Sequence, residues 1–121
     1  VLLDGGHNPE CGAALARVLR DFAPENVTAV IGMMEDKDTA HYLKAVTPYV
    51  KTIWFTKPKN PRAAAPEDLK AQIGDFPGEI FLEPNVPAAF ENAKRATPND
   101  GLVLVCGSFY LLSDLGLPIE N

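Results

Sequence analysis

Short apolar runs alternate along this chain with longer stretches in which apolar residues recur every three or four positions. Runs rich in β-branched residues are typical of strands buried on both faces, and the wider spacing is typical of amphipathic helices. The pattern predicts strands at 1–4, 27–31, 51–56, 79–82 and 102–106. It predicts helices at 9–21, 39–49, 66–73, 85–96 and 109–115, the fourth of which starts at Asn85 or at Pro87.

Strands that are separated by single helices imply right-handed crossovers and a parallel sheet with helices on both faces. We therefore predict an α/β fold, a Rossmann-like, doubly wound and mainly parallel sheet of five or six strands. In such sheets, ligands meet the loops at the carboxyl ends of the strands. Four loops are expected at that edge: 4–8, 33–38, 57–62 and 107–108.

Two details of the core also follow from the pattern. Six apolar residues of the first helix are expected to face the core: Ala13, Ala14, Leu15, Val18, Leu19 and Phe22. The loop 57–65 is expected to stay outside the core because it is polar.

Composition narrows the class of protein. With 121 residues, 46% of them hydrophobic and 22% charged, the chain is expected to form one compact domain over 1–121. The net charge of −5 argues against nucleic-acid binding, which needs a positive surface to neutralise phosphates. Cys11 and Cys106 are too few for a disulfide scaffold, and no apolar run approaches the roughly 20 residues of a membrane span. We therefore expect a cytoplasmic monomer that binds neither nucleic acid nor membranes.

The chain opens inside a strand pattern and without methionine. We therefore expect a domain excised from a longer polypeptide.

The segment 4–9, Asp-Gly-Gly-His-Asn-Pro, joins the first strand to the first helix. Its two glycines permit a sharp turn, Asn8 can cap the helix, and Pro9 fits the first helical turn. The free N–H groups of the helix start, a carboxylate and an imidazole would then face the space beyond the strand, which suits a polar ligand. The sequence has no G-x-G-x-x-G fingerprint in this loop and no G-x-x-x-x-G-K-[ST] phosphate loop anywhere. We therefore do not expect this chain to hold ATP by itself.

The two strand-to-helix joints, at 4–8 and at 107–108, also have purely structural interpretations. Asp4 can be a turn former that accepts a hydrogen bond from a backbone N–H of the loop, and Ser108 can cap the last helix. His7 can be a surface histidine, since no Ser or Cys nucleophile pattern accompanies it. His41, on the second helix, is better interpreted as a solvated residue.

The other two loops have structural interpretations as well. On composition alone, 36–38 is an ordinary charged loop in which Asp38 or Thr39 caps the next helix. Arg62 stands alone between Pro61 and three alanines. A single arginine in a long loop is often a reader of carboxylates or phosphates.

Four segments form a set: LDGGHNP at 3–9, GMMEDKD at 32–38, PRAA at 61–64 and GSFY at 107–110. They resemble, in the same order and spacing, the LDGAHNP, G-M-x-x-D-K-D, P-R-A/G-A and G-S-F/L-Y/H motifs of one enzyme family. These are the folylpolyglutamate synthases and bifunctional dihydrofolate synthases of the Mur ligase superfamily. The histidine of the first motif separates this family from the peptidoglycan branches of the superfamily.

The resemblance implies that the full enzyme uses ATP and Mg²⁺ to form an acyl phosphate on a folate or dihydropteroate carboxylate. The amino group of glutamate then attacks it to form an amide. The phosphate loop and the metal ligands would belong to a preceding N-terminal ATPase domain, over which the C-terminal domain closes. The isolated fragment is therefore expected to be inactive, with no certain catalytic residue and no metal ligand of its own.

The resemblance also implies roles for individual residues of this domain. Asp4 would contact the nucleotide, through its ribose hydroxyls. His7 and Ser108 would place the incoming glutamate, and the Arg62 guanidinium would pair with a glutamate carboxylate. Further positions of the cleft would be Asn8, Asp36, Lys37 and Asp38.

Two other functions stay open on the sequence. One is another amino-acid ligase of the Mur type, and the other is a non-catalytic nucleotide-binding or interaction module with the same fold. A phosphate loop upstream of Val1 in the parent polypeptide would separate the enzyme from the module. The resemblance does not decide between a monofunctional and a bifunctional enzyme.

Overall fold

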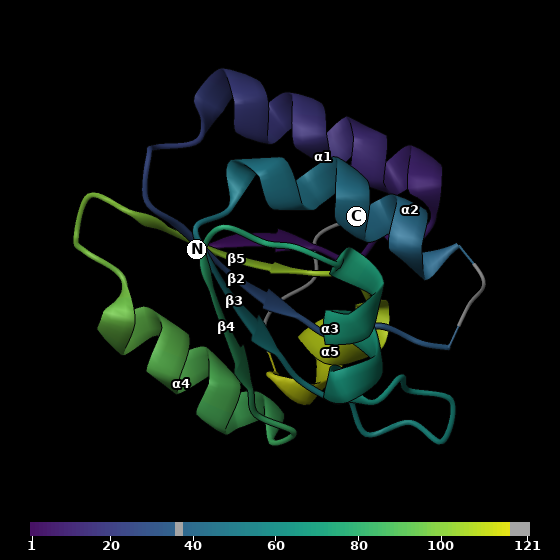
Figure 1. The fold of residues 1–121 in the computed structure, drawn as a ribbon. Helices are drawn as coiled ribbons and strands as arrows, with labels where there is room; N and C mark the ends of the chain where they lie inside the picture. The colour runs from purple at the N-terminus through teal and green to yellow at the C-terminus, as the bar shows by residue number, and fades with distance from the viewer. Residues whose placement is uncertain (36–37, 117–121) are drawn as a thin grey trace.

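The computed structural model describes residues 1–35 and 38–116 and contains a five-stranded sheet between two layers of helices (Figure 1). The strands are β1 (Leu2–Asp4), β2 (Val27–Ile31), β3 (Thr52–Phe55), β4 (Glu79–Leu82) and β5 (Leu102–Cys106). The helices are α1 (Pro9–Phe22), α2 (Thr39–Val46), α3 (Pro66–Ile73), α4 (Val86–Ala96) and α5 (Phe109–Asp114), and a 3₁₀ turn, η1 (Thr47–Tyr49), follows α2. The predicted α/β fold class and all five predicted strands are confirmed. Within the described ranges, no helix combines the length and hydropathy needed to cross a membrane.

All neighbouring strands are parallel, and their order across the sheet is β1-β5-β2-β3-β4. The last strand in the sequence thus lies between the first two. In this register, Asp4 lies beside Cys106, and Cys106 lies beside Ile31 on its other side. Because the strands are parallel, the loops that follow β1, β5, β2 and β3 all leave the same edge of the sheet.

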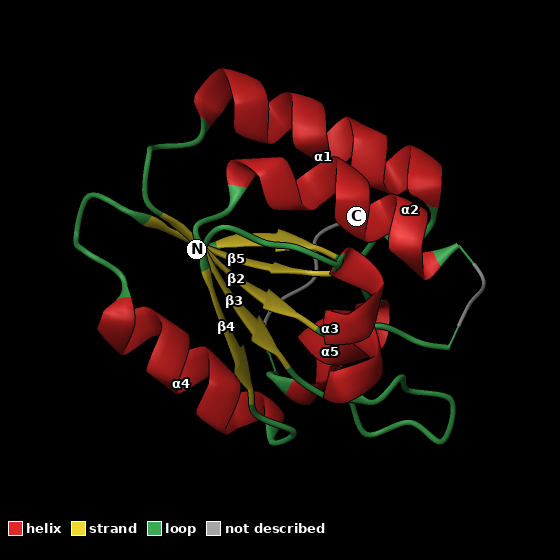
Figure 2. Ribbon diagram, in the orientation of Figure 1, coloured by secondary structure: helices red, strands yellow, loops and turns green. Residues whose placement is uncertain are grey.

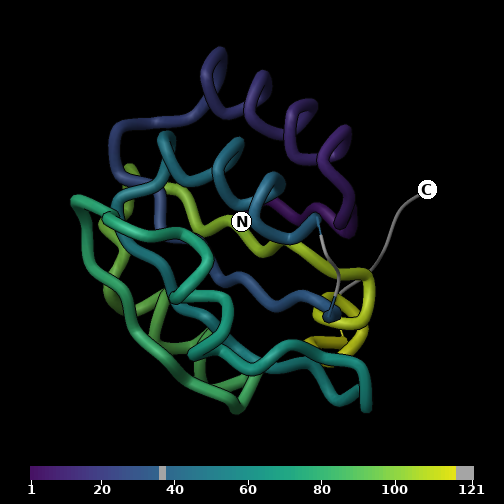
Figure 3. The backbone as a smooth tube through the Cα atoms, turned by 45° about the vertical axis from the view of Figure 1, so that its right-hand side comes forward, coloured from purple at the N-terminus to yellow at the C-terminus, as the bar shows by residue number. Residues whose placement is uncertain are grey.

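The helices cover the two faces of the sheet unequally (Figures 2 and 3). The core beneath α1, α2 and α3 contains Ala29 and Ile31 of β2, whereas Val30 belongs to the core beneath α4 and α5. This alternation follows from the period of two along a strand, and it leaves all five residues of β2 buried. The chain after β5 turns toward α5, on the face opposite to the helices that follow β1 and β2. The edge next to β5 is therefore a topological switch point, where ligands bind in open α/β sheets.

Within residues 1–35 and 38–116, three helices begin with a side-chain cap. Asn8 Oδ1 accepts the Cys11 N–H at 2.8 Å, and Ser108 Oγ accepts the Tyr110 N–H at 3.0 Å. Both of these caps were expected from the sequence. Asn85 Oδ1 accepts the Ala88 N–H at 2.9 Å, so Asn85 is the cap and the fourth helix begins at Val86, between its two predicted starts.

The apolar face of α1 is narrower than its sequence pattern predicted. Only Gly12, Leu15 and Leu19 are buried, while Val18 is 43% exposed and Phe22 is 82% exposed. Two more residues predicted to face the core are exposed: Ala13 and Ala14. The reason is that α1 packs mainly on α2 through a single stripe, so that side chains one position to either side of it face solvent.

The loop between β3 and α3 is partly core, and the prediction that it is too polar for the core was wrong. Ala63 is 3% exposed and Ala64 is 4% exposed. An isolated antiparallel bridge pairs Ala63 with Met34, and the Ala64 N–H donates to the Met33 carbonyl at 2.8 Å. This bridge fastens the loop to the segment that follows β2.

Candidate functional site

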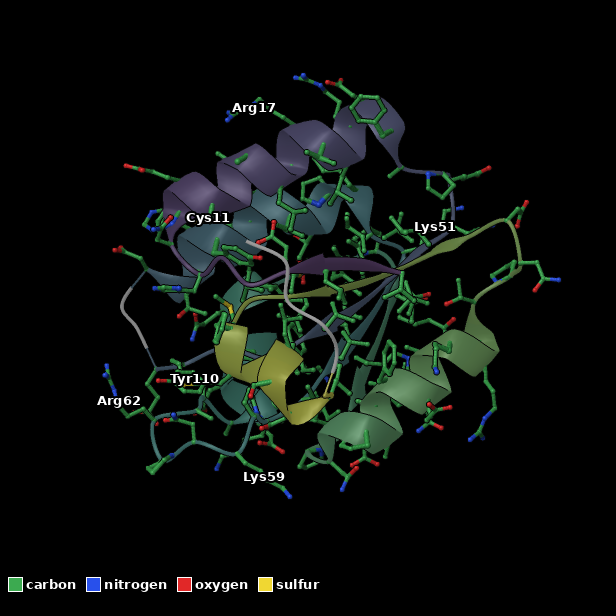
Figure 4. All side chains as sticks on the ribbon, turned by 180° about the vertical axis from the view of Figure 1, so that it is seen from behind. Cys11, Arg17, Lys51, Lys59, Arg62 and Tyr110 are labelled. Atoms are coloured by element: carbon green, nitrogen blue, oxygen red, sulfur yellow. The ribbon has the colours of Figure 1, made fainter. Side chains whose placement is uncertain are left out.

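The joints after β1 and β5 meet at the carboxyl edge of the sheet, as predicted. A Cβ placed on Gly5 would lie 3.5 Å from Phe109 Cα, so the two joints are in contact there. Seen from behind the first view, Cys11, Tyr110 and Arg62 lie at one side of the molecule and Lys51 at the opposite side (Figure 4). The candidate residues therefore gather at one edge, and the amino-terminal edge of the sheet lies away from them.

Asp4 is half-buried and holds the turn that follows β1. Its Oδ1 accepts the Gly6 N–H at 2.8 Å, so the turn-forming role is present in the structure. A Cβ on Gly6 would lie 2.5 Å from Cys11 Cβ and 3.0 Å from that same Oδ1, and hence the turn needs glycine at this position. Among the described residues, no hydrogen bond reaches Oδ2, which leaves this oxygen able to accept a ligand hydroxyl.

His7 and Asn8 follow the turn and are both exposed. Asn8 uses its side-chain oxygen to cap α1, so its role in the structure is local. The His7 imidazole stands on the open surface within three residues of Asp4. A ligand could therefore contact both a carboxylate and an imidazole from this loop.

Ser108 is only 2% exposed, because Gly107 presses the start of α5 against the segment after β2. Gly107 has φ +107°, and a Cβ on it would lie 2.8 Å from both the Gly32 carbonyl oxygen and Met33 Cγ. Ser108 Oγ already accepts the Tyr110 N–H, as the capping interpretation required. Its hydroxyl proton is still available, since a serine hydroxyl donates one hydrogen bond in addition to those that it accepts.

The Arg62 loop reaches the segment after β2 through its backbone. The Glu35 N–H donates to the Arg62 carbonyl at 2.7 Å, and the Arg62 N–H donates to Asn60 Oδ1 at 2.9 Å. The side chain itself is exposed and points away from the body of the domain (Figure 4). The structure thus brings the Arg62 loop to the candidate edge, but it does not bring the guanidinium to Asp4 or Ser108.

The charged segment before α2 is described only in part. Asp36 and Lys37 lie outside the described residues. Asp38 is the N-cap residue of α2, without a side-chain capping bond, and its Oδ1 lies 3.8 Å from His41 Nδ1. The side chain of His41 is 73% exposed, which confirms its interpretation as a solvated residue.

A buried polar cluster lies behind the Asp4 turn, and the sequence pattern did not reveal it. Burial raises the pKa of the Cys106 thiol to about 12, with a smaller lowering effect from the Tyr42 hydroxyl and a smaller raising effect from the Asp4 carboxylate. Burial also raises the pKa of the Tyr42 phenol above its usual value, with Cys106, Asp4 and Cys11 adding to the effect. Both groups therefore keep their protons at neutral pH. The helical spacing had marked Tyr42 only as a core residue, and no local signal showed that it would share a cluster with Cys106 at the end of β5.

The described residues do not form an evident metal centre. No group of three His, Cys, Asp or Glu side chains converges within the ranges that the structure describes. A hollow of about 700 Å³ opens at the amino-terminal edge, where Asn26, Lys51 and Glu79 are among its lining residues. It contains none of the residues that the sequence marked as candidates.

A family model described as Mur ligase, glutamate ligase domain matches residues 1–109. The dihydrofolate synthase/folylpolyglutamate synthase of Escherichia coli K12 is 34% identical over 116 residues, which cover 93% of this chain and 26% of that protein. A probable bifunctional folylpolyglutamate synthase/dihydropteroate synthase of Haloferax volcanii is 33% identical over 115 residues, which cover 94% of this chain and 14% of that protein.

The structural comparison agrees with these sequence matches. The structure of E. coli FolC in complex with DHPP and ADP has a TM-score of 0.83 and 28% identity, over 93% of this chain and 26% of that chain. The chain thus spans about a quarter of the E. coli protein and less of the archaeal one.

Proposed function

The chain belongs to the Mur ligase glutamate ligase domain family, and from this premise we propose that residues 1–121 are the C-terminal domain of an ATP-dependent folylpolyglutamate synthase. The observation that carries the proposal is the position of the family motifs. The segments at 3–9 and 107–110 contact each other, and the segments at 32–38 and 61–64 are joined by the bridge between Met34 and Ala63. The relatives that match over nearly the whole chain are named as enzymes of this class.

In this proposal, the enzyme adds glutamate to a folate, and in a bifunctional form also to dihydropteroate. Asp4 accepts ribose hydroxyls of ATP through its unoccupied Oδ2. The His7 imidazole and the Ser108 hydroxyl position the incoming glutamate, and Arg62 pairs with one of its carboxylates after its loop has moved toward the site. The other cleft positions are Asn8, Asp36, Lys37 and Asp38.

The domain would supply positioning rather than phosphate chemistry. Its sequence has no phosphate loop, and its described residues contain no group of three His, Cys, Asp or Glu side chains that could hold a metal ion. We therefore assign ATP phosphate binding and magnesium binding to an N-terminal ATPase domain of the same polypeptide. Closure of the two domains would shield the acyl phosphate from water before the glutamate amino group attacks it.

The test is glutamate-dependent turnover by the full-length protein that carries this domain. With ATP, Mg²⁺ and a reduced folate, we expect ADP and a folate lengthened by one glutamate, both detected by mass spectrometry. Asp4→Ala should raise the KM for ATP, and His7→Ala should raise the KM for glutamate, each by about ten- to a hundredfold. Turnover with another amino acid in place of glutamate would indicate another Mur-type ligase, and no turnover with any would indicate a non-catalytic module.

A further inference from the structure

Tyr42 has a buried hydroxyl for which the packing of the core gives no reason. The residue is 0% exposed, and its Oη has no hydrogen-bond partner in the part of the chain that the structure describes. An unpaired buried hydroxyl is costly, and a phenylalanine would fill the same space without that cost. Such a group in a folded protein calls for an explanation beyond packing.

The ring of Tyr42 lies against the start of α1, in the same core cluster as Cys106 and next to Cys11. Tyr42 projects from α2 past Gly12 of α1, where a Cβ would lie only 3.0 Å from Tyr42 Cδ2. After burial, the groups that raise the pKa of the hydroxyl are the Cys106 thiol, the Asp4 carboxylate and the Cys11 thiol. These groups come from the end of β5, the end of β1 and the first turn of α1.

Of these three groups, Asp4 is the one that carries a carboxylate. Cys106 and Asp4 are partners in the parallel register of β5 and β1, so the thiol is the direct neighbour of the carboxylate. In a low-dielectric interior, hydroxyl and thiol dipoles orient in the field of a nearby charge and in turn stabilise it.

We propose that Tyr42 is a positioning residue for Asp4. Its buried hydroxyl and the neighbouring Cys106 thiol lie behind the carboxylate and hold it in one orientation. In that orientation, Oδ1 accepts the Gly6 N–H and Oδ2 is presented to a ligand. The ligand is a nucleoside, recognised through its ribose hydroxyls, and this last step rests on the proposed function. Tyr42 does not touch the ligand itself.

The first experiment measures the orientation of Asp4 without any activity. The Asp4–Gly6 hydrogen bond protects the Gly6 amide, so its hydrogen-exchange rate in the 121-residue chain, measured by NMR, reports on the carboxylate. Tyr42→Phe removes a single atom and should accelerate exchange at Gly6 by about three- to tenfold, because a less firmly oriented Asp4 carboxylate weakens the hydrogen bond that protects this amide. Tyr49→Phe is the matched control, because Tyr49 lies in η1 and is 36% exposed.

Two results decide the first experiment. The melting temperature of Tyr42→Phe should equal or exceed that of the parent, because the deleted hydroxyl has no hydrogen-bond partner among the described residues. In an Asp4→Asn background, Tyr42→Phe should no longer change Gly6 exchange, because the charge on which it acts is gone. Unchanged exchange at Gly6 in Tyr42→Phe, or an equal effect with and without the Asp4 charge, would overturn the proposal.

The second experiment uses the full-length enzyme and tests the consequence for the ligand. Tyr42→Phe should raise the KM for ATP by about three- to tenfold and leave the KM for glutamate unchanged, with no further effect in Asp4→Asn. A faster Gly6 exchange combined with an unchanged KM for ATP would overturn the nucleotide role. If the parent enzyme does not ligate glutamate, the proposed function fails, and the Gly6 measurement still decides whether Tyr42 positions Asp4.

Discussion

Ser108→Ala separates the structural role of Ser108 from its proposed role in glutamate binding. The serine caps α5 through the Tyr110 N–H at 3.0 Å, and removing a side-chain cap costs about 1 kcal/mol of stability. Unfolding entropy is roughly 2.1 cal/mol/K per residue, which for this chain gives about 0.25 kcal/mol/K. The melting temperature of Ser108→Ala should therefore fall by about 4 °C.

The structure offers a matched control for this loss. Asn85 caps α4 through the Ala88 N–H at 2.9 Å, in a segment outside the four family motifs. Asn85→Ala should thus lower the melting temperature by a similar amount, about 4 °C. Ser108→Ala should additionally raise the KM for glutamate by about ten- to a hundredfold, since a hydrogen bond to a charged ligand contributes roughly 1.5 to 3 kcal/mol. Asn85→Ala should leave that constant unchanged.

The assay is steady-state glutamate addition by the full-length enzyme, at a temperature at least 15 °C below the lower melting temperature of the two variants. Under that condition, both proteins are almost completely folded, and a loss of stability cannot imitate a change in KM. If the two variants lose equal stability and have the same KM for glutamate as the parent, Ser108 is a helix cap only. The placement of glutamate beside α5 would then be wrong.

Three further predictions follow from the structure. Gly107→Ala should destabilise the chain by about 2 to 6 kcal/mol in urea unfolding, because the new side chain would strain the backbone and lie too close to the Gly32 carbonyl and Met33. Gly74→Ala is the control: at φ +63° with nothing within 4 Å of the new Cβ, it should cost only about 1 to 2 kcal/mol. Burial raises the pKa of Cys106 to about 12, whereas an unfolded cysteine titrates at about 8.5. The contribution of this protonated thiol to the free energy of unfolding is therefore complete below about pH 8.5, and it falls by up to ~1.4 kcal/mol per pH unit as the pH rises toward 12. The urea midpoint should be lower at pH 10 than at pH 8, and Cys106→Ala should reduce this difference. The 121-residue chain alone should hydrolyse no ATP in a phosphate-release assay with Mg²⁺, folate and glutamate present, and turnover by the pure chain would show that catalytic groups have been missed.

Local features of the sequence predicted local structure well. The apolar run of β5 and the capping residues Asn8 and Ser108 were found because each depends on its immediate neighbours. Phe22 was placed in the core wrongly, because helical spacing gives the direction of an apolar face but not its width, which is set by how α1 meets α2. Ala63 was missed as a core residue because its burial depends on a bridge to Met34, and that partner is distant in the sequence.

The candidate site shows the same division. The sequence predicted that 4–8 and 107–108 would meet, because a parallel sheet brings the ends of its strands to one edge. It could not show that Ser108 would be nearly inaccessible, since this results from the packing of Gly107 against Gly32. It also could not show that Tyr42 and Cys106 would share one core cluster behind Asp4, because that arrangement requires the position of β5 between β1 and β2.

The insertion of β5 between β1 and β2 also determines when the domain can fold. The strand that carries Asp4 has β5 as its sheet neighbour, and β5 is synthesised about a hundred residues later. A nascent chain can pair β2 with β3 and β3 with β4 as it leaves the ribosome, while β1 and the loop at 4–9 wait for a partner. Such distant pairings slow folding and leave strand edges exposed in the meantime. The nucleotide side of the proposed site is therefore among the first segments to be made and among the last to be assembled.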